Sequence, residues 1–156
     1  MTLVETIAVC ALSVLLIAAL AAYDLARKPY AVSAAVGVVG SMLDDARSVA
    51  QTSGSGATLL ITSAGTSFEA SIYPYRPLAG ADLSAPAVRT VSGTANVTPA
   101  AIFIDTSGTT SSNATWTPAS GTLETEPICT SALQLTFGDG FGSETHSVPC
   151  SRAQLQ

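Results

Sequence analysis

Few residues of this 156-residue chain are of the types that carry out acid–base, nucleophilic or metal chemistry. The chain has one histidine, His146, and three cysteines, Cys10, Cys129 and Cys150. No glycine-rich phosphate motif and no nucleophile–base pattern accompanies them. The remaining residue whose position has chemical meaning is Glu5, an acid close to the start of an apolar run. We therefore expect no catalytic site and no cofactor, and the chain is not predicted to be an enzyme.

The segment 137–144, FGDGFGSE, carries acidic oxygens of the kind that ligate calcium. Its spacing matches no EF-hand loop, and a glycine-rich hairpin turn explains the same residues. His146, two residues after Glu144, fits a surface strand better than a catalytic role. We therefore predict no metal site in this segment.

The composition of the chain excludes two broad classes of protein. Hydrophobic residues make up 47% and charged residues 11%, whereas about 25% of an ordinary soluble domain is charged. This excludes a disordered chain, which needs high charge and low hydrophobicity. The formal net charge is −5, with only six lysines and arginines, so the basic stripe that binds a phosphate backbone is missing. No nucleic-acid partner is expected.

Residues 6–22, TIAVCALSVLLIAALAA, form a run without a charged residue, proline or glycine. About 20 such residues span the hydrocarbon core of a bilayer, roughly 30 Å thick. Because the run is apolar on every side, its expected surroundings are lipid or a bundle of helices. A secretory signal peptide is disfavoured because no basic segment precedes the run, the run is longer than the 7–15 apolar residues of a signal peptide, and no crisp A-x-A cleavage site closes it.

Glu5 lies near the tip of this apolar helix. A lone carboxylate in apolar surroundings costs several kcal/mol unless it is paired or neutralised. A plain membrane anchor, the simpler alternative, would leave this residue without a role. The position of Glu5 therefore indicates a function.

Residues 1–6, MTLVET, followed by an unbroken apolar helix, resemble the mature N-terminus of type IV pilins and type II secretion pseudopilins. The resemblance implies that a prepilin peptidase removes a leader before Met1 and that the new N-terminus is methylated. Met1 stands where the family usually has phenylalanine. Helices packed in a filament core would bury the Met1 amine, and pairing with Glu5 of a neighbouring subunit would offset the desolvation of both charges. Met1 and Glu5 are therefore the expected assembly residues.

The same resemblance implies a location and a set of partners. The chain would be held in the bacterial inner membrane and then polymerise with copies of itself through its N-terminal helix. Assembly would use the prepilin peptidase, an inner-membrane platform protein and a cytoplasmic ATPase. The product would be an extracellular pilus or a periplasmic pseudopilus.

Residues 41–73 carry a weaker resemblance to the heads of minor pilins and H-type pseudopilins. We expect a structural subunit of an extracellular type IV pilus-like filament. The alternatives are a pseudopilin of a type II secretion system and, in a different class, a membrane-anchored periplasmic or surface binding module. The sequence does not separate adhesion, motility, DNA uptake and secretion.

The apolar pattern changes after Pro29. From there to about residue 51, apolar residues recur at spacings of three and four, which predicts an amphipathic helix ended by the turn residues TSGSG at 52–56. Pro29 lacks an N–H and is expected to kink or briefly break the helix. The predicted organisation is an apolar membrane or filament-core helix (1–28), an amphipathic helix that enters the head (29–53) and a β-rich head (54–156).

The head is expected to hold some five to seven antiparallel strands. The candidate strands are 57–62, 67–73, 87–91, 100–105, 113–117, 132–137 and 144–148, and the Thr/Ser/Gly-rich segment 105–120 is expected to be an exposed loop or edge. The predicted class is α+β, with a long N-terminal α-helix packed on an antiparallel β-sheet head that has a C-terminal disulfide loop.

The disulfide prediction rests on the positions of the three cysteines. Cys10 lies inside the apolar helix, where it acts as a small apolar residue and cannot reach the head. Cys129 and Cys150 remain, and a bond between them would stabilise the head by roughly 3 kcal/mol in an oxidising compartment. Pilins often carry such a loop; two reduced cysteines are the alternative.

Overall fold

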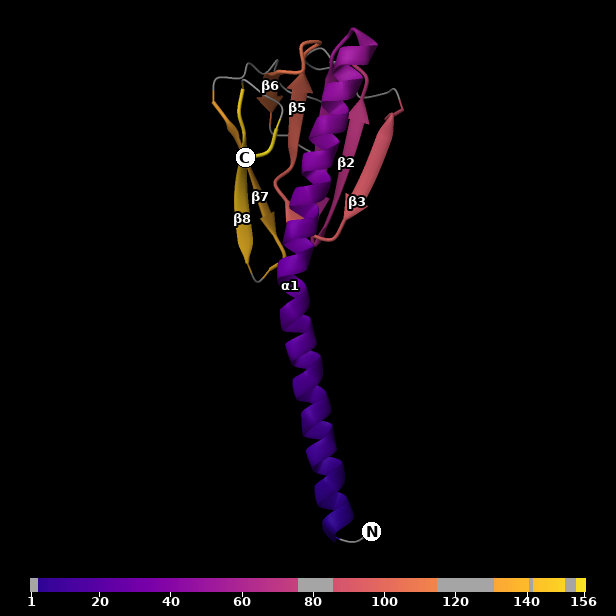
Figure 1. Ribbon diagram of the computed structural model, residues 1–156, viewed down its shortest axis with the longest axis vertical. Coiled ribbons are helices and arrows are strands. Elements are labelled where there is room, and N and C mark those ends of the chain that lie inside the picture. Colours follow the sequence, from indigo (N-terminus) through magenta and orange to yellow (C-terminus); the bar gives the residue numbers. More distant parts are fainter. Residues whose placement is uncertain (1–2, 76–85, 115–130, 141, 151–153) are drawn as a thin grey trace.

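The computed structural model of the chain is a helical stalk that leads into a β-rich head (Figure 1). It describes residues 3–75, 86–114, 131–140, 142–150 and 154–156, without the side chains of 3–6, 8, 24–29 and 111–114. One helix, α1, spans Leu3–Ser53, and its second half lies along the head.

The second half of α1 is amphipathic, as the sequence predicts. Its buried side chains recur at spacings of three and four and face the head. They are Val32, Ala35, Val39, Met42, Leu43, Ala46 and Ala50, none more than 5% exposed. The predicted helix from about 29 to 53 is therefore confirmed in position and in its buried face.

α1 is a single element across Pro29. The short break that we considered there is not present, because the loss of one N–H does not outweigh the hydrogen bonds of the turns on either side. A bend of the helix at Pro29 stays a prediction.

Glycines end α1, as the pattern at 52–56 predicts. Gly54 has a φ of 69°, the left-handed conformation common directly after a helix. The Ser53 hydroxyl donates a hydrogen bond to the Gly56 carbonyl at 3.0 Å. Gly56 also has a positive φ, 79°, and a Cβ there would lie 2.7 Å from the Ile104 carbonyl oxygen. This close approach lets the chain leave α1 and enter the sheet directly.

The strands form two antiparallel sheets. In the larger sheet the spatial order is β3 (Arg89–Gly93), β2 (Ser67–Tyr73), β1 (Ala57–Ala64), β5 (Ala100–Ile104) and β6 (Thr110–Ala114). In the smaller sheet the order is β4 (Asn96–Val97), β7 (Leu133–Gly138) and β8 (Ser143–Val148).

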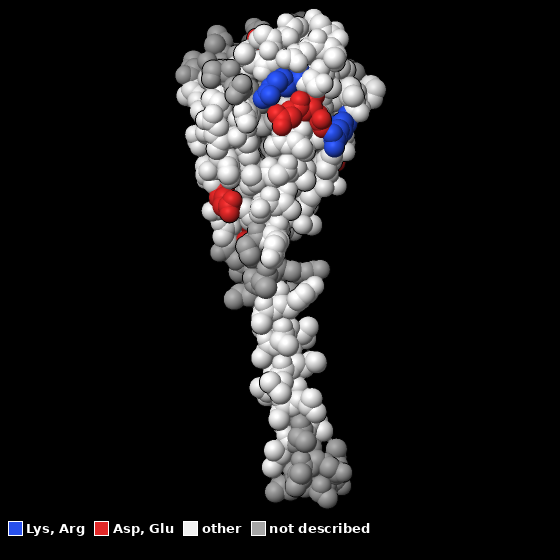
Figure 2. Space-filling view, in the orientation of Figure 1, with Lys and Arg blue, Asp and Glu red and all other residues white. Residues whose placement is uncertain are grey.

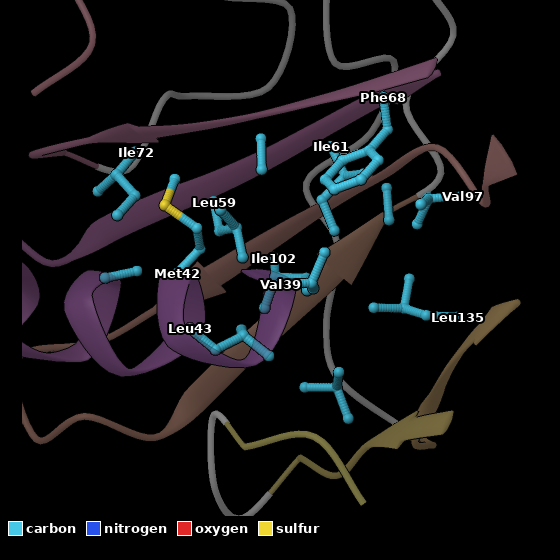
Figure 3. Close-up of a cluster of buried hydrophobic side chains, with 14 of the residues drawn as sticks. Val39, Met42, Leu43, Leu59, Ile61, Phe68, Ile72, Val97, Ile102 and Leu135 are labelled. Atoms are coloured by element: carbon cyan, nitrogen blue, oxygen red, sulfur yellow. The ribbon is translucent and has the colours of Figure 1, made fainter. Parts of the chain in front are cut away.

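One hydrophobic core joins α1 to both sheets. Figure 3 shows Met42 and Leu43 of α1 directed toward side chains of the larger sheet, with Leu135 of β7 at the margin. At the junction of the sheets the Ser63 hydroxyl accepts the Val97 N–H at 3.3 Å. The core thus holds the second half of α1 on the head and leaves the first half outside it.

The predicted fold class needs correction. We expected one antiparallel sheet, but the described strands form two, with β4, β7 and β8 paired among themselves beside the five-stranded sheet. We also expected a C-terminal disulfide loop, and no disulfide joins two residues of the described ranges: Cys10 is free, and Cys129 lies outside them. Cys150 is disulfide-bonded, and its predicted partner, Cys129, lies in a segment outside the described residues.

All seven predicted strands lie within three residues of observed ones. β4 was not predicted, because its pairing covers only two residues. The segment 105–120 was predicted as an exposed loop or edge with a strand over 113–117, and Thr110–Ala114 forms β6 at one edge of the larger sheet. Thr110, however, is buried. Pairing with β5 overrides the turn-forming composition there; residues 115–120 lie outside the described ranges.

Replacing Gly56 with alanine tests the close contact between the end of α1 and β5. Gly56→Ala and Gly65→Ala both place a side chain at a positive φ, at a cost of roughly 1–2 kcal/mol. Of these two variants, only Gly56→Ala also places its new methyl group against a backbone carbonyl, that of Ile104. The unfolding free energy of Gly56→Ala should therefore fall further, by about 3 kcal/mol in all. Urea unfolding of the full chain measures both; equal losses would contradict the contact.

Candidate assembly surface on the N-terminal helix

The first half of α1 exposes large apolar side chains that nothing in the described part of the chain covers. We call residues 7–23 the rod. Nine of its large apolar side chains are 53–68% exposed: Ile7, Val9, Leu12, Val14, Leu15, Leu16, Ile17, Leu20 and Tyr23. Full burial of one such side chain is worth about 1.5–3 kcal/mol. Together they represent on the order of 10 kcal/mol available to whatever covers the rod.

Few polar groups lie on the described part of the rod. The Ser13 hydroxyl donates to the Val9 carbonyl at 2.8 Å, one turn back along the helix, and the Tyr23 hydroxyl lies at the end of the rod nearest the head. Cys10 is a free, exposed thiol that behaves as a small apolar residue. Because the Ser13 hydroxyl is satisfied within the helix and most other side chains are apolar, the rod is suited to apolar surroundings.

One side of the rod has a shallow, open hollow. It is lined by Ile7, Cys10, Ala11, Val14 and Leu15, almost entirely with apolar atoms. Residues 7, 10, 11 and 14 have the spacing of four residues that together receive one side chain of a packed helix. The rod thus has a socket of the kind that helix–helix packing uses.

The predicted assembly residues fall largely outside the described structure. Met1 lies outside the described ranges, and of Glu5 only the helical backbone is described. Their pairing and the methylation of Met1 therefore stay predictions. No helix in the described part of the chain is both long and apolar enough to cross a membrane.

Charged side chains gather on the head, over the upper part of α1, and none lies on the rod among the described residues (Figure 2). Asp45 of α1 forms an ion pair with Arg89 of β3, and Asp44 lies 3.4 Å from Arg47, three residues along the helix. Both pairs are partly exposed, so each contributes little stability. The Asp45–Arg89 pair was not predicted, because 44 residues separate the partners.

The turn between β5 and β6 is organised by Asp105. Its carboxylate accepts hydrogen bonds from the backbone N–H groups of Ser107 and Thr109 and from both of their hydroxyls. Partial burial by itself raises the pKa of Asp105, but these hydrogen bonds outweigh it and hold the pKa below its usual value. Sequence reasoning placed this turn in a loop and missed the role of Asp105.

The acidic residues weighed as calcium ligands have structural roles. Asp139 accepts the Gly142 N–H at 3.0 Å and so closes the turn between β7 and β8. His146 Nε2 lies 3.6 Å from Glu144 Oε2 on β8, and its ring contacts Phe137 edge to face. These contacts account for the residues as parts of a hairpin.

No family model, no curated protein and no solved structure matches the chain. The argument for function therefore depends on the rod itself.

The Asp105 turn makes a prediction about pH. The pKa of Asp105 is lower in the folded chain than in the unfolded chain, where it is about 4. The ionised carboxylate therefore contributes its full stabilisation to the folded state above about pH 4. This contribution is lost as the pH falls through the pKa of the folded state. Asp105→Ala should lower the unfolding free energy at pH 7 by roughly 1 kcal/mol, and this difference should shrink below about pH 4.

Denaturant unfolding of the full chain between pH 3 and pH 7 measures the effect. Asp44→Ala is the control, because Asp44 is an exposed carboxylate on α1 and its removal should change little. A loss at Asp105 that stays the same down to pH 3 would contradict the assigned role.

Proposed function

We propose that the chain is a structural subunit of a type IV pilus-like filament that polymerises through its rod. The observation that carries the proposal is the exposure of large apolar side chains on every side of residues 7–23. An all-round apolar helix is stable in lipid or among other helices, but not in water. The most economical partners are further copies of the same helix.

The geometry of the rod favours a polymer over a dimer. A single partner helix covers one face, so the opposite face of the rod would stay exposed. Closed pairs use the same surface on both copies, whereas contacts between two different surfaces repeat without closing and generate helical filaments. A rod that is apolar all round can accept several neighbours, as a filament core requires.

In the proposed filament, the rod would form the contacts between subunits and the head would be displayed on the outside. The second half of α1 is already buried against the head, so assembly through the rod leaves the head packing unchanged. The head surface would then face outward, and its charged pairs would remain in solvent. This division supports a subunit that displays its head along a filament.

The proposed register depends on Glu5. A carboxylate among apolar helices is tolerated when a cation meets it, and the amine of Met1 in a neighbouring copy would supply that charge. A wrong stagger would leave both charges unpaired. The proposal includes methylation of Met1, a precursor in the bacterial inner membrane, and assembly by the peptidase, platform protein and ATPase named above. The filament would be an extracellular pilus or, alternatively, a periplasmic secretion pseudopilus.

Glu5→Ala tests the proposal. We expect the variant to lose assembly, because the amine of each neighbour is left without a counter-charge, while circular dichroism still shows a folded head. The measurement is the amount of chain that sediments as filaments after shearing from cells. Ser13→Ala is the matched control, since it also removes a polar group from the helix but one that is satisfied internally.

The competing function is a membrane-anchored binding module. It predicts a detergent-soluble monomer that behaves identically with glutamate or alanine at position 5. Equal recovery of Glu5→Ala and Ser13→Ala in the sedimented fraction would contradict the proposed role of Glu5. Absence of any sedimentable polymer of the wild-type chain would overturn the filament proposal.

A further inference from the structure

The rod has two faces of different side-chain size. At 3.6 residues per turn, five small residues fall on one side, which we call the small face: Cys10, Ala11, Ala18, Ala21 and Ala22. Two larger residues, Ile7 and Val14, fall on the same side in its N-terminal half and border the hollow there. Five larger residues fall on the opposite side, which we call the large face: Val9, Leu12, Leu16, Leu20 and Tyr23. All ten are exposed. The rod is therefore apolar all round but not uniform.

The small face is hollowed. Its N-terminal part is the hollow described above, where Cys10 and Ala11 lie between larger neighbours. Farther along, Ala18 and Ala22 are spaced by four residues, the arrangement that lets two helix backbones approach closely. From Ala18 to Ala22 this face is formed by alanine side chains, which leave room for the side chains of a neighbouring helix.

The large face forms a ridge. Leu12, Leu16 and Leu20 recur every four residues and are 60–68% exposed. Rows of side chains with this spacing insert into the grooves of a neighbouring helix. The chain thus presents a ridge and a hollow of matching apolar character on opposite sides of the same helix.

We infer that the large face of one copy docks into the small face of the next copy, so that the filament core is built from a repeated contact between two different surfaces. This rests on the proposed function and names the surfaces that perform it. Pairing small face with small face would leave every ridge exposed, and pairing large with large would leave every hollow empty. Only the mixed contact covers both, and it leaves one free face of each kind for further copies.

The surface area that one such contact would bury favours an assembly in which each copy makes several contacts. Each large side chain offers on the order of 100 Å², so the large face supplies roughly 500 Å² and a contact buries about 1,000 Å² from both copies. This is near the lower limit for a specific protein interface. One contact alone is weak, and a copy held on both faces makes two. Stable association therefore requires a series of copies.

Disulfide crosslinking within the rod tests the mixed contact. Leu16→Cys places a thiol on the large face, and the native Cys10 lies on the small face. Residues 10 and 16 of one helix are about 9 Å apart along the axis, too far for a disulfide within one chain. Mild oxidation with copper–phenanthroline of the full-length chain, recovered in its sedimented form, should therefore give a ladder of dimers, trimers and longer products.

Two controls separate the alternatives. The wild-type chain should gain no crosslink through Cys10, and Ala18→Cys, which has both thiols on the small face, should give no ladder. Dimers from the wild type or from Ala18→Cys would mean that small faces meet. A Leu16→Cys product that stops at the dimer would mean that large faces meet. Either result overturns the inference.

The test also distinguishes the inference from the proposed function. If the wild type and Leu16→Cys sediment as filaments but no ladder forms, the mixed contact is wrong and the filament proposal stands. If neither sediments and no rod crosslink forms, both fail.

Discussion

A helix with large apolar side chains on every side is not stable in water, and this constraint governs the rest of the molecule. The rod bears nine such side chains, and its serine hydroxyl is already bonded within the helix. Its surroundings must therefore be apolar. Every other part of the interpretation, including the role of Glu5 and the two faces of the rod, follows from what can supply those surroundings.

In the head, by contrast, the apolar side chains of α1 are already covered by the rest of the chain. From Val32 onward the same helix buries only one face, and the larger sheet together with β7 of the smaller sheet covers it. The glycines at 54 and 56 turn the chain directly into β1, and Ser63 connects the two sheets at Val97. One continuous helix thus carries two kinds of surface. The half inside the head already packs its apolar face against the head, whereas the apolar side chains of the rod are uncovered, so the rod is the apolar surface of α1 available for self-association.

The sequence predicted the elements that local patterns control. The buried stripe of α1, its glycine end and the β1–β2 hairpin follow from spacing of three and four, from positive-φ turns and from alternation. The sequence did not predict which distant segments pair with each other. Nothing local indicates that β4 joins β7, that β6 pairs with β5, or that Asp45 meets Arg89. For the rod, the sequence predicted apolar packing, and the hollow around Cys10 revealed which side is concave.

Electron cryomicroscopy of material sheared from cells tests the central claim most directly, because it shows what surrounds residues 7–23. The account predicts filaments whose core consists of these helices, each in contact with the rods of several other copies. Chains whose rods contact only lipid or detergent, and no other rod, would contradict it.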